Sequence, residues 1–160
     1  MGFTRAGVSK IWGNFCGSTP NVPTARLWNM GFSSTEPNMI DGSNFTEPNS
    51  EETGYHRVSL TFGSAANSFH LTTIDGGRSI TTTQTVFMPE PTNNWTPNAG
   101  EMSNYFGMFN GSTLEFYGEL RDAVTNNVGV NVTTGHIFFI REGDFKITVD
   151  PEPVVANVGE

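Results

Sequence analysis

The sequence has one cysteine, two lysines and few charged residues overall. Cys16 alone cannot form a disulfide within the chain, and a metal site built from several cysteines is excluded. Lys and Arg together number 8 against 16 Asp and Glu, so the net charge is -8. Because nucleic-acid affinity depends on Lys and Arg releasing counterions, we expect no nucleic-acid partner. The acidity fits either solubility or attraction to a positively charged partner, and the composition does not separate the two.

Long apolar segments and known catalytic motifs are also missing. No apolar stretch of roughly 18 residues occurs and no signal-peptide core follows Met1, so we expect no membrane partner and retention in the cytoplasm until assembly. The GxSxG, P-loop, GxGxxG and EF-hand patterns are absent. His56, His70 and His136 do not have zinc-binding spacing. We therefore predict no catalytic residue, no metal ligand and no cofactor.

Small polar residues take the place of the missing charges. The chain has 20 Thr, 16 Asn and 12 Ser, with 18 Gly and 9 Pro, a composition that disfavours helical bundles and favours strands joined by tight turns. Apolar alternation is interrupted by turn signals about every 8–15 residues. This pattern predicts an all-β fold, an antiparallel β-sandwich, jelly-roll-like, with about eight strands and one short N-terminal helix.

The expected helix covers residues 3 to 16. Its apolar side chains follow the i, i+3, i+4, i+7 spacing of one helix face, with Gly17 as a stop; they are Val8, Ile11, Trp12 and Phe15. Such a helix either closes the core or grips another subunit. We divide the chain into an N-terminal helix and arm (1–24), a β-sandwich domain (25–150) and a polar C-terminal tail (151–160).

Several strands and loops follow from the same reading. Ala25 to Phe32 predicts a buried strand, and Ser33 to Gly54 a long polar loop that is either functional or mobile. The next strand has an apolar face of His56, Val58, Leu60 and Phe62. Hairpin turns are expected at Asp75-Gly76-Gly77 and at Asn110-Gly111.

The remaining strands are less regular. In Arg78 to Met88, a row of Ser79, Thr81, Thr83 and Thr85 predicts a solvated face. Val124 to Thr133 is a strand candidate, and His136 to Ile140 predicts a strand buried on both faces. Phe145, Ile147 and Val149 alternate with polar residues in the last strand.

Trp95 is the best candidate for an exposed aromatic contact, because it lies in a polar loop from Pro89 to Gly100. Together with Tyr117 it supports a second functional hypothesis, a carbohydrate-binding module that stacks sugars on aromatic rings. A hydrolase with an unrecognised site is a third and least favoured hypothesis. Glu115 and Glu119 do not form a glycosidase pair, because residues i and i+4 of a strand lie about 13 Å apart.

An ordered series of short motifs resembles a family of small tailed-bacteriophage virion proteins, often labelled tail-fibre or minor structural proteins. The resemblance covers about residues 3 to 150. The motifs are Leu27–Phe32 with Thr35-Glu36-Pro37, Gly54-Tyr55-His56-Arg57-Val58, Val86-Phe87-Met88-Pro89, Asn94-Trp95, Tyr105-Phe106-Gly107-Met108-Phe109, Phe116-Tyr117-Gly118-Glu119-Leu120 and Gly143-Asp144-Phe145-Lys146-Ile147-Thr148-Val149-Asp150.

The resemblance implies a non-enzymatic β-sandwich component of a virion, made in the host bacterial cytoplasm. We expect a capsid decoration or cement protein that binds the outer surface of the major capsid shell, as a dimer or trimer, or alternatively a tail or tail-fibre attachment protein. Fibre shafts need repeats, which the sequence lacks. The expected partner-binding residues are Phe3, Val8, Ile11, Trp12, Phe15, Glu36, Phe45 and Trp95.

Overall fold

The structure is a computed structural model that describes residues 27–38, 40–62, 70–74, 79–96, 103–122 and 124–148. The predicted N-terminal helix, the tail and the turn Asp75-Gly76-Gly77 lie outside the described residues. The described part contains nine strands and one short helix. In chain order they are β1 (Leu27–Ser33), α2 (Ser50–Thr53), β2 (Val58–Phe62), β3 (His70–Ile74), β4 (Ser79–Thr82), β5 (Val86–Phe87), β6 (Tyr105–Asn110), β7 (Thr113–Glu119), β8 (Phe139–Ile140) and β9 (Lys146–Thr148). The all-β prediction is thus confirmed.

The chain divides into two compact units. The first unit consists of residues 27–60 and 86–140, and the second of residues 1–26, 61–85 and 141–160. Residues of the predicted domain 25–150 therefore contribute to both units, and β2 runs across the boundary between them.

In the first unit, β7, β6, β1 and β2 lie side by side in that order. β1 and β6 pair antiparallel with Gly31 opposite Gly107, and β6 and β7 form the predicted hairpin around Gly111 and Ser112. Gly111 has a φ of 62°, which glycine adopts without strain in such a tight turn. A bulge after Met108 shifts the register of the hairpin. The prediction of a buried strand between Ala25 and Phe32 is confirmed by β1, in which Trp28, Met30 and Phe32 are buried.

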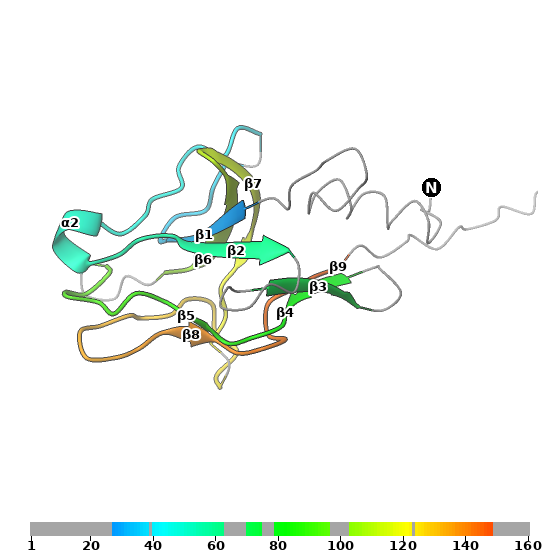
Figure 1. The fold of residues 1–160 in the computed structure, drawn as a ribbon. Coiled ribbons are helices and arrows are strands. Elements are labelled where there is room, and N and C mark those ends of the chain that lie inside the picture. The colour runs from blue at the N-terminus through cyan, green and yellow to red at the C-terminus, as the bar shows by residue number, and fades with distance from the viewer. Residues whose placement is uncertain are drawn as a thin grey trace, which may run out of the picture. The chain divides into compact units, whose positions relative to one another are not determined.

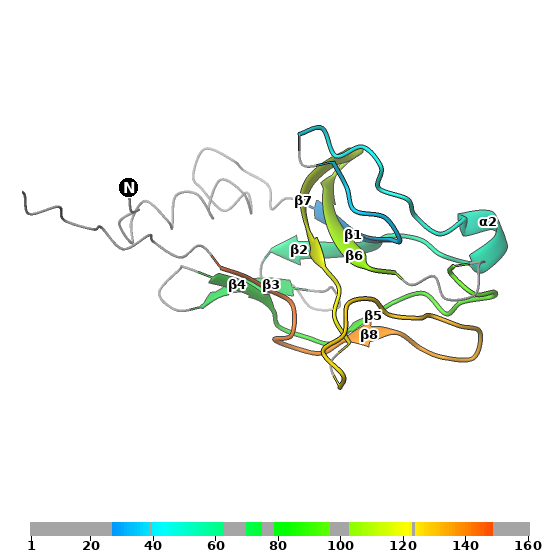
Figure 2. The same ribbon diagram turned by 180° about the vertical axis from the view of Figure 1, so that it is seen from behind.

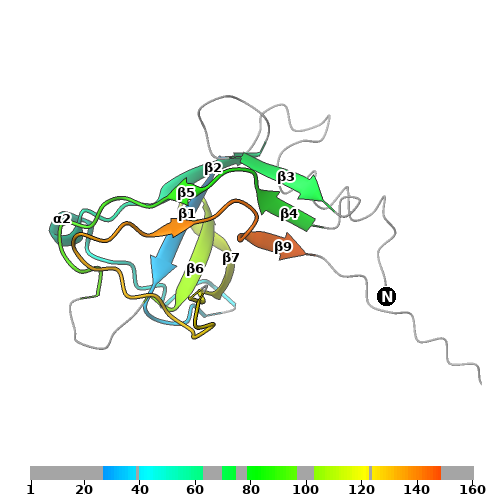
Figure 3. The same cartoon turned by 90° about the horizontal axis from the view of Figure 1, so that it is seen from below.

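In the first unit, β1 and β6 are covered on both faces. The two-stranded ribbon of β5 and β8 lies on one side, and the loop that follows β1 lies on the other (Figures 1 and 2). From below, the ribbon lies in front of β1 and β6 (Figure 3). The ring of Phe138 beside the ribbon meets Phe32 of β1 at a centroid distance of 5.4 Å. A packed aromatic layer therefore separates the ribbon from the strands.

The opposite face of β1 and β6 carries the paired glycines Gly31 and Gly107. A Cβ atom at Gly31 would lie 2.6 Å from the Glu47 carboxylate, and one at Gly107 would lie 2.6 Å from the Phe45 ring. Only glycine leaves room for these side chains of the covering loop. The two glycines thus make a shallow depression in which the loop after β1 packs.

In the second unit, β3, β4 and β9 pair antiparallel, with Ile74 opposite Ser79 across the predicted hairpin. The end of β2 pairs in parallel with β3, which the antiparallel prediction missed. The prediction of a solvated Thr row is wrong for the part that forms β4, because Ser79 and Thr81 of that row are buried. Thr81 donates to the carbonyl oxygen of Phe145 over 2.8 Å, so its hydroxyl meets backbone where water was expected.

Three further local predictions are corrected. His136 to Ile140 is not a buried strand, since Ile137 and Phe139 are 59% and 42% exposed and only Phe139–Ile140 is strand. Val124 to Thr133 does not form a strand; it makes only two isolated β-bridges, at Val128 and Val130. His56 is exposed, because the alternation begins only at Val58.

Candidate functional site

Of the eight predicted partner-binding residues, the structure describes Glu36, Phe45 and Trp95. Phe3, Val8, Ile11, Trp12 and Phe15 lie outside the described residues. Glu36 is exposed on the loop after β1. Phe45, on the same loop, is half-buried and meets the Phe109 ring edge to face at 5.0 Å. Trp95 lies in a different loop of the same unit.

The prediction that Trp95 is exposed is wrong. Its side chain is 1% exposed and is surrounded by the rings of Phe32, Tyr55 and Phe138 at centroid distances of 5.7, 5.1 and 6.2 Å. The polar composition of the loop around Trp95 suggested an exposed side chain. The Trp95 ring is buried because it is the largest apolar group of that loop and packs beneath β1. Its Nε1–H is buried and has no hydrogen-bond partner in the described part of the chain.

The loop after β1 is held by its own hydrogen bonds. The Ser33 hydroxyl accepts from the amide of Thr46 over 2.8 Å and donates to the carbonyl oxygen of Thr35 over 2.7 Å. The Thr35 hydroxyl donates to that of Thr46 over 2.8 Å. Asn49 caps α2 by accepting from the amide of Glu51. The loop is thus an ordered part of the fold and presents fixed side chains.

A cluster of Glu47, Tyr55 and Arg57 fastens the loop to the strands. Glu47 Oε1 accepts from the Tyr55 hydroxyl at 2.6 Å and from Arg57 Nε at 2.9 Å, and Oε2 accepts from Arg57 Nη2 at 2.6 Å. The Tyr55 hydroxyl also accepts from the buried amide of Phe32 at 2.9 Å. The Arg57 guanidinium lies 3.4 Å from the centre of the Phe109 ring. A bidentate ion pair, a phenol and a ring face together fix the position of Glu47.

The same cluster shifts the ionisation of its members. Burial, followed by the hydrogen bond to Glu47 and the charge of Glu47, raises the pKa of Tyr55 well above its ordinary value of 10.0. The hydrogen bond to Glu47 raises the pKa of Arg57 as well. Tyr55 is therefore a neutral donor and Arg57 a permanent cation across physiological pH.

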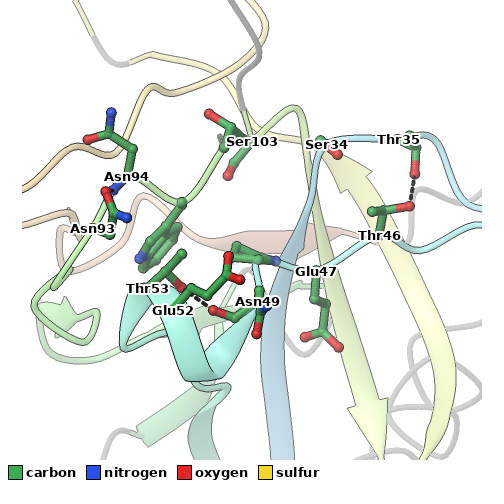
Figure 4. Close-up of a pocket in the computed structure, with 13 residues that line it drawn as sticks. Ser34, Thr35, Thr46, Glu47, Asn49, Glu52, Thr53, Asn93, Asn94 and Ser103 are labelled. Carbon is green, nitrogen blue, oxygen red and sulfur yellow. Dashed lines mark hydrogen bonds between the residues drawn. The ribbon is translucent and has the colours of Figure 1, made fainter. Parts of the chain in front are cut away.

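A pocket of about 530 Å³ opens between the loop after β1 and the residues around Trp95 (Figure 4). Its walls consist mainly of side chains that carry hydroxyl or amide groups. They are Ser34, Thr35, Thr46, Thr53, Thr96 and Ser103 with Asn49, Asn93 and Asn94. Glu47 and Glu52 add carboxylates, and Pro48 and Trp95 add apolar surface. None of the described residues that line it is a Lys, Arg or His.

The sequence predicts both loops, but it does not predict that they contact each other. A backbone hydrogen bond joins them, in which the amide of Thr92 donates to the Thr53 carbonyl over 3.0 Å. The amide of Trp95 donates to the Val132 carbonyl over 3.1 Å, which holds the second loop to the segment before β8. Asparagine and threonine in both loops were the only signal, and these residues are common throughout the chain.

A second surface feature is an apolar patch on the β5–β8 ribbon, formed by Phe87, Ile137 and Phe139. These side chains are 57%, 59% and 42% exposed. Phe87 and Phe139 are cross-strand partners with ring centroids 5.9 Å apart. We call these three residues the ribbon patch.

Within the described ranges, no three His, Cys, Asp or Glu side chains gather where they could hold a metal ion. No helix in the same ranges has the length and apolar character needed to span a bilayer. No protein-family model, no curated protein and no solved structure matches the chain.

Proposed function

We propose that this protein is a non-enzymatic structural component of a tailed-phage virion. The preferred role is a capsid decoration or cement protein that binds the outer surface of the major capsid shell and stabilises it. Attachment in the tail or tail fibre is the alternative within the same class. We further propose that the strands of the first unit and the β5–β8 ribbon are the two layers of a β-sandwich of jelly-roll type.

The ribbon patch is the observation that carries this proposal. Isolated exposed apolar residues are ordinary, but here two phenylalanine rings neighbour each other across the ribbon, and a third exposed apolar residue, Ile137, lies two positions before Phe139. Aromatic side chains of this kind are enriched in the centres of protein interfaces. In the described part of the chain, each strand of the ribbon also has one unpaired edge. Docking against a neighbouring shell subunit would cover both features.

The rigid loop after β1 supports the same role. Because its hydrogen bonds and the Glu47–Arg57 ion pair already fix its conformation, binding through it requires little ordering. A protein that stabilises a shell needs such preformed contact surfaces more than it needs a reactive centre.

The carbohydrate-stacking alternative is not supported in its original form. It required Trp95 to offer a free ring face, and that ring is 1% exposed.

Purified virions of the phage that encodes the chain test the proposal. Quantitative mass spectrometry of such particles should find the protein in a fixed ratio to the major capsid protein, and cryo-electron microscopy should place it outside the shell. Particles that lack the protein should release their genome at a lower temperature. The protein present in infected cells but absent from purified particles would contradict the proposal.

Two variants test the role of the ribbon patch. Phe87→Ser with Phe139→Ser should lower the number of copies per particle, because it removes apolar contact area. Val124→Ser is the matched control, since Val124 is 90% exposed and lies outside the ribbon. Equal occupancy for both proteins would show that the patch is not the contact surface.

A further inference from the structure

We propose that the pocket between the loop after β1 and Trp95 binds a neutral polyhydroxylated ligand, a carbohydrate of one or two sugar units. This inference goes beyond the structural role proposed above and does not depend on it. The volume of about 530 Å³ lies within the range of roughly 300–1,000 Å³ that is typical of small-molecule sites.

The chemistry of the walls selects the ligand class. Hydroxyl and amide groups both donate and accept hydrogen bonds, as sugar hydroxyls do. Anionic ligands are disfavoured, because no cationic side chain is found among the described residues that line the pocket. The open surface of the pocket is part polar and part apolar, so a purely apolar ligand would leave its hydroxyl, amide and carboxylate groups unpaired. A neutral ligand rich in hydroxyl groups fits what remains.

Several hydrogen-bonding groups in the walls are unused within the described part of the chain. Asn93 and Asn94 accept through their side-chain oxygens from the amides of Asn94 and Thr134, which leaves both side-chain NH₂ groups without a partner. The Ser34 hydroxyl and the Glu52 carboxylate also make no hydrogen bond there. Figure 4 shows Asn93 and Asn94 on one side of the pocket and Ser34 on another. A ligand can therefore bridge donors and acceptors from separate walls.

These groups are also held in position. Glu52 belongs to α2, whose last residue accepts the backbone hydrogen bond from Thr92, just before Asn93. The oxygens of Asn93 and Asn94 are fixed by the hydrogen bonds already described. Preorganised walls lose little conformational entropy when a ligand binds.

Trp95 provides an independent observation at the same place. Its ring lines the pocket, and its buried Nε1–H has no acceptor among the described residues. Buried donors without an acceptor are rare and destabilising, and the neighbouring ring faces are weak acceptors. An unpaired donor therefore lies on a ring that borders the pocket. The Nε1–H resonance is also a reporter, because only three tryptophans are present.

Nuclear magnetic resonance on the full chain, labelled with ¹⁵N, tests the proposal. The probes are glucose, galactose, mannose, N-acetylglucosamine, maltose and cellobiose, each titrated separately, with glucuronate and spermidine as charged comparisons. At least one neutral sugar should shift the indole resonance of Trp95, assigned with Trp95→Phe, and the side-chain amides of Asn93 and Asn94. Glucuronate and spermidine should leave these resonances unchanged.

Two matched pairs of variants localise the binding. Asn93→Ala should weaken binding about threefold to tenfold, the effect of one neutral hydrogen bond, whereas Asn127→Ala, an exposed asparagine outside the pocket, should not. Glu52→Ala should weaken binding, and Glu51→Ala, its neighbour on α2 outside the pocket, should not. Unchanged spectra with all six sugars, a response to spermidine or glucuronate alone, or equal binding by both members of each pair would overturn the proposal.

Discussion

The Tyr55 hydroxyl holds two parts of the first unit together, so its removal is the sharpest test of the fold. In Tyr55→Phe, the Glu47 carboxylate loses a donor at 2.6 Å and the Phe32 amide loses its acceptor at 2.9 Å. Phe32 is 1% exposed, so water does not replace that acceptor. The ring itself remains and still packs against Trp95.

The expected loss is about 3 kcal/mol of unfolding free energy. A hydrogen bond to a charged group contributes roughly 1.5–3 kcal/mol, and a buried amide left without a partner costs about 1–3 kcal/mol. The two effects overlap, because one hydroxyl serves both. For a chain of this length, the midpoint of thermal unfolding should fall by roughly 6–12 °C.

Urea unfolding followed by tryptophan fluorescence measures the loss, and amide hydrogen exchange at Phe32 shows where it occurs. Tyr117→Phe is the matched control, because the described part of the chain gives the Tyr117 hydroxyl no hydrogen bond and the change should stay within about 0.5 kcal/mol. A loss below about 1 kcal/mol in Tyr55→Phe, or an equal loss in both variants, would refute the assignment of the cluster as the fastening point.

Three further outcomes follow from the same contacts. Gly31→Ala should destabilise the protein by more than about 1 kcal/mol in urea unfolding, since its new methyl group meets Glu47, and adding Glu47→Ala should reverse part of that loss in a double-mutant cycle. Burial raises the pKa of Tyr55, so the contribution of its protonated phenol to the free energy of unfolding is fully present below pH 10.0. Above that pH the free energy of unfolding should fall by about 1.4 kcal/mol per pH unit, and urea unfolding at alkaline pH should show this slope in the parent protein but not in Tyr55→Phe. Thr81→Val should lower the melting temperature, because the Phe145 carbonyl loses the Thr81 hydroxyl and keeps only the Thr82 amide as a donor; a higher melting temperature would contradict the buried position of Thr81.

Apolar alternation in the sequence located strands well but did not show which faces are covered. Trp28, Met30 and Phe32 repeat every second residue and are buried as expected. Ser79 and Thr81 look like part of a solvated face, yet the Ser79 hydroxyl is hydrogen-bonded with the Thr148 hydroxyl of β9 and Thr81 donates to the Phe145 carbonyl. A threonine side chain fits water and a buried carbonyl equally well, so local pattern cannot distinguish them. Which face of the strand is buried depends on pairing with segments far away in the sequence, and a single sequence does not show that pairing.

The candidate pocket could not be predicted from the sequence for the same reason. Both loops were predicted as polar segments. Their contact depends on the hydrogen bond from Thr92 to α2 and on the Trp95 ring, which packs against Phe32 of β1. The glycine pair was a readable signal, since Gly31 and Gly107 interrupt apolar strands where a close approach is the usual reason for glycine.

The two carboxylates of the pocket differ in how much of their hydrogen-bonding capacity is left for a ligand. Glu47 accepts three hydrogen bonds, one from the Tyr55 hydroxyl and two from the Arg57 guanidinium. Glu52 is the one described lining carboxylate without a hydrogen bond in the described part of the chain. We therefore expect a sugar hydroxyl in the pocket to donate to Glu52, because the oxygens of Glu47 are already used to fasten the loop after β1 to the strands.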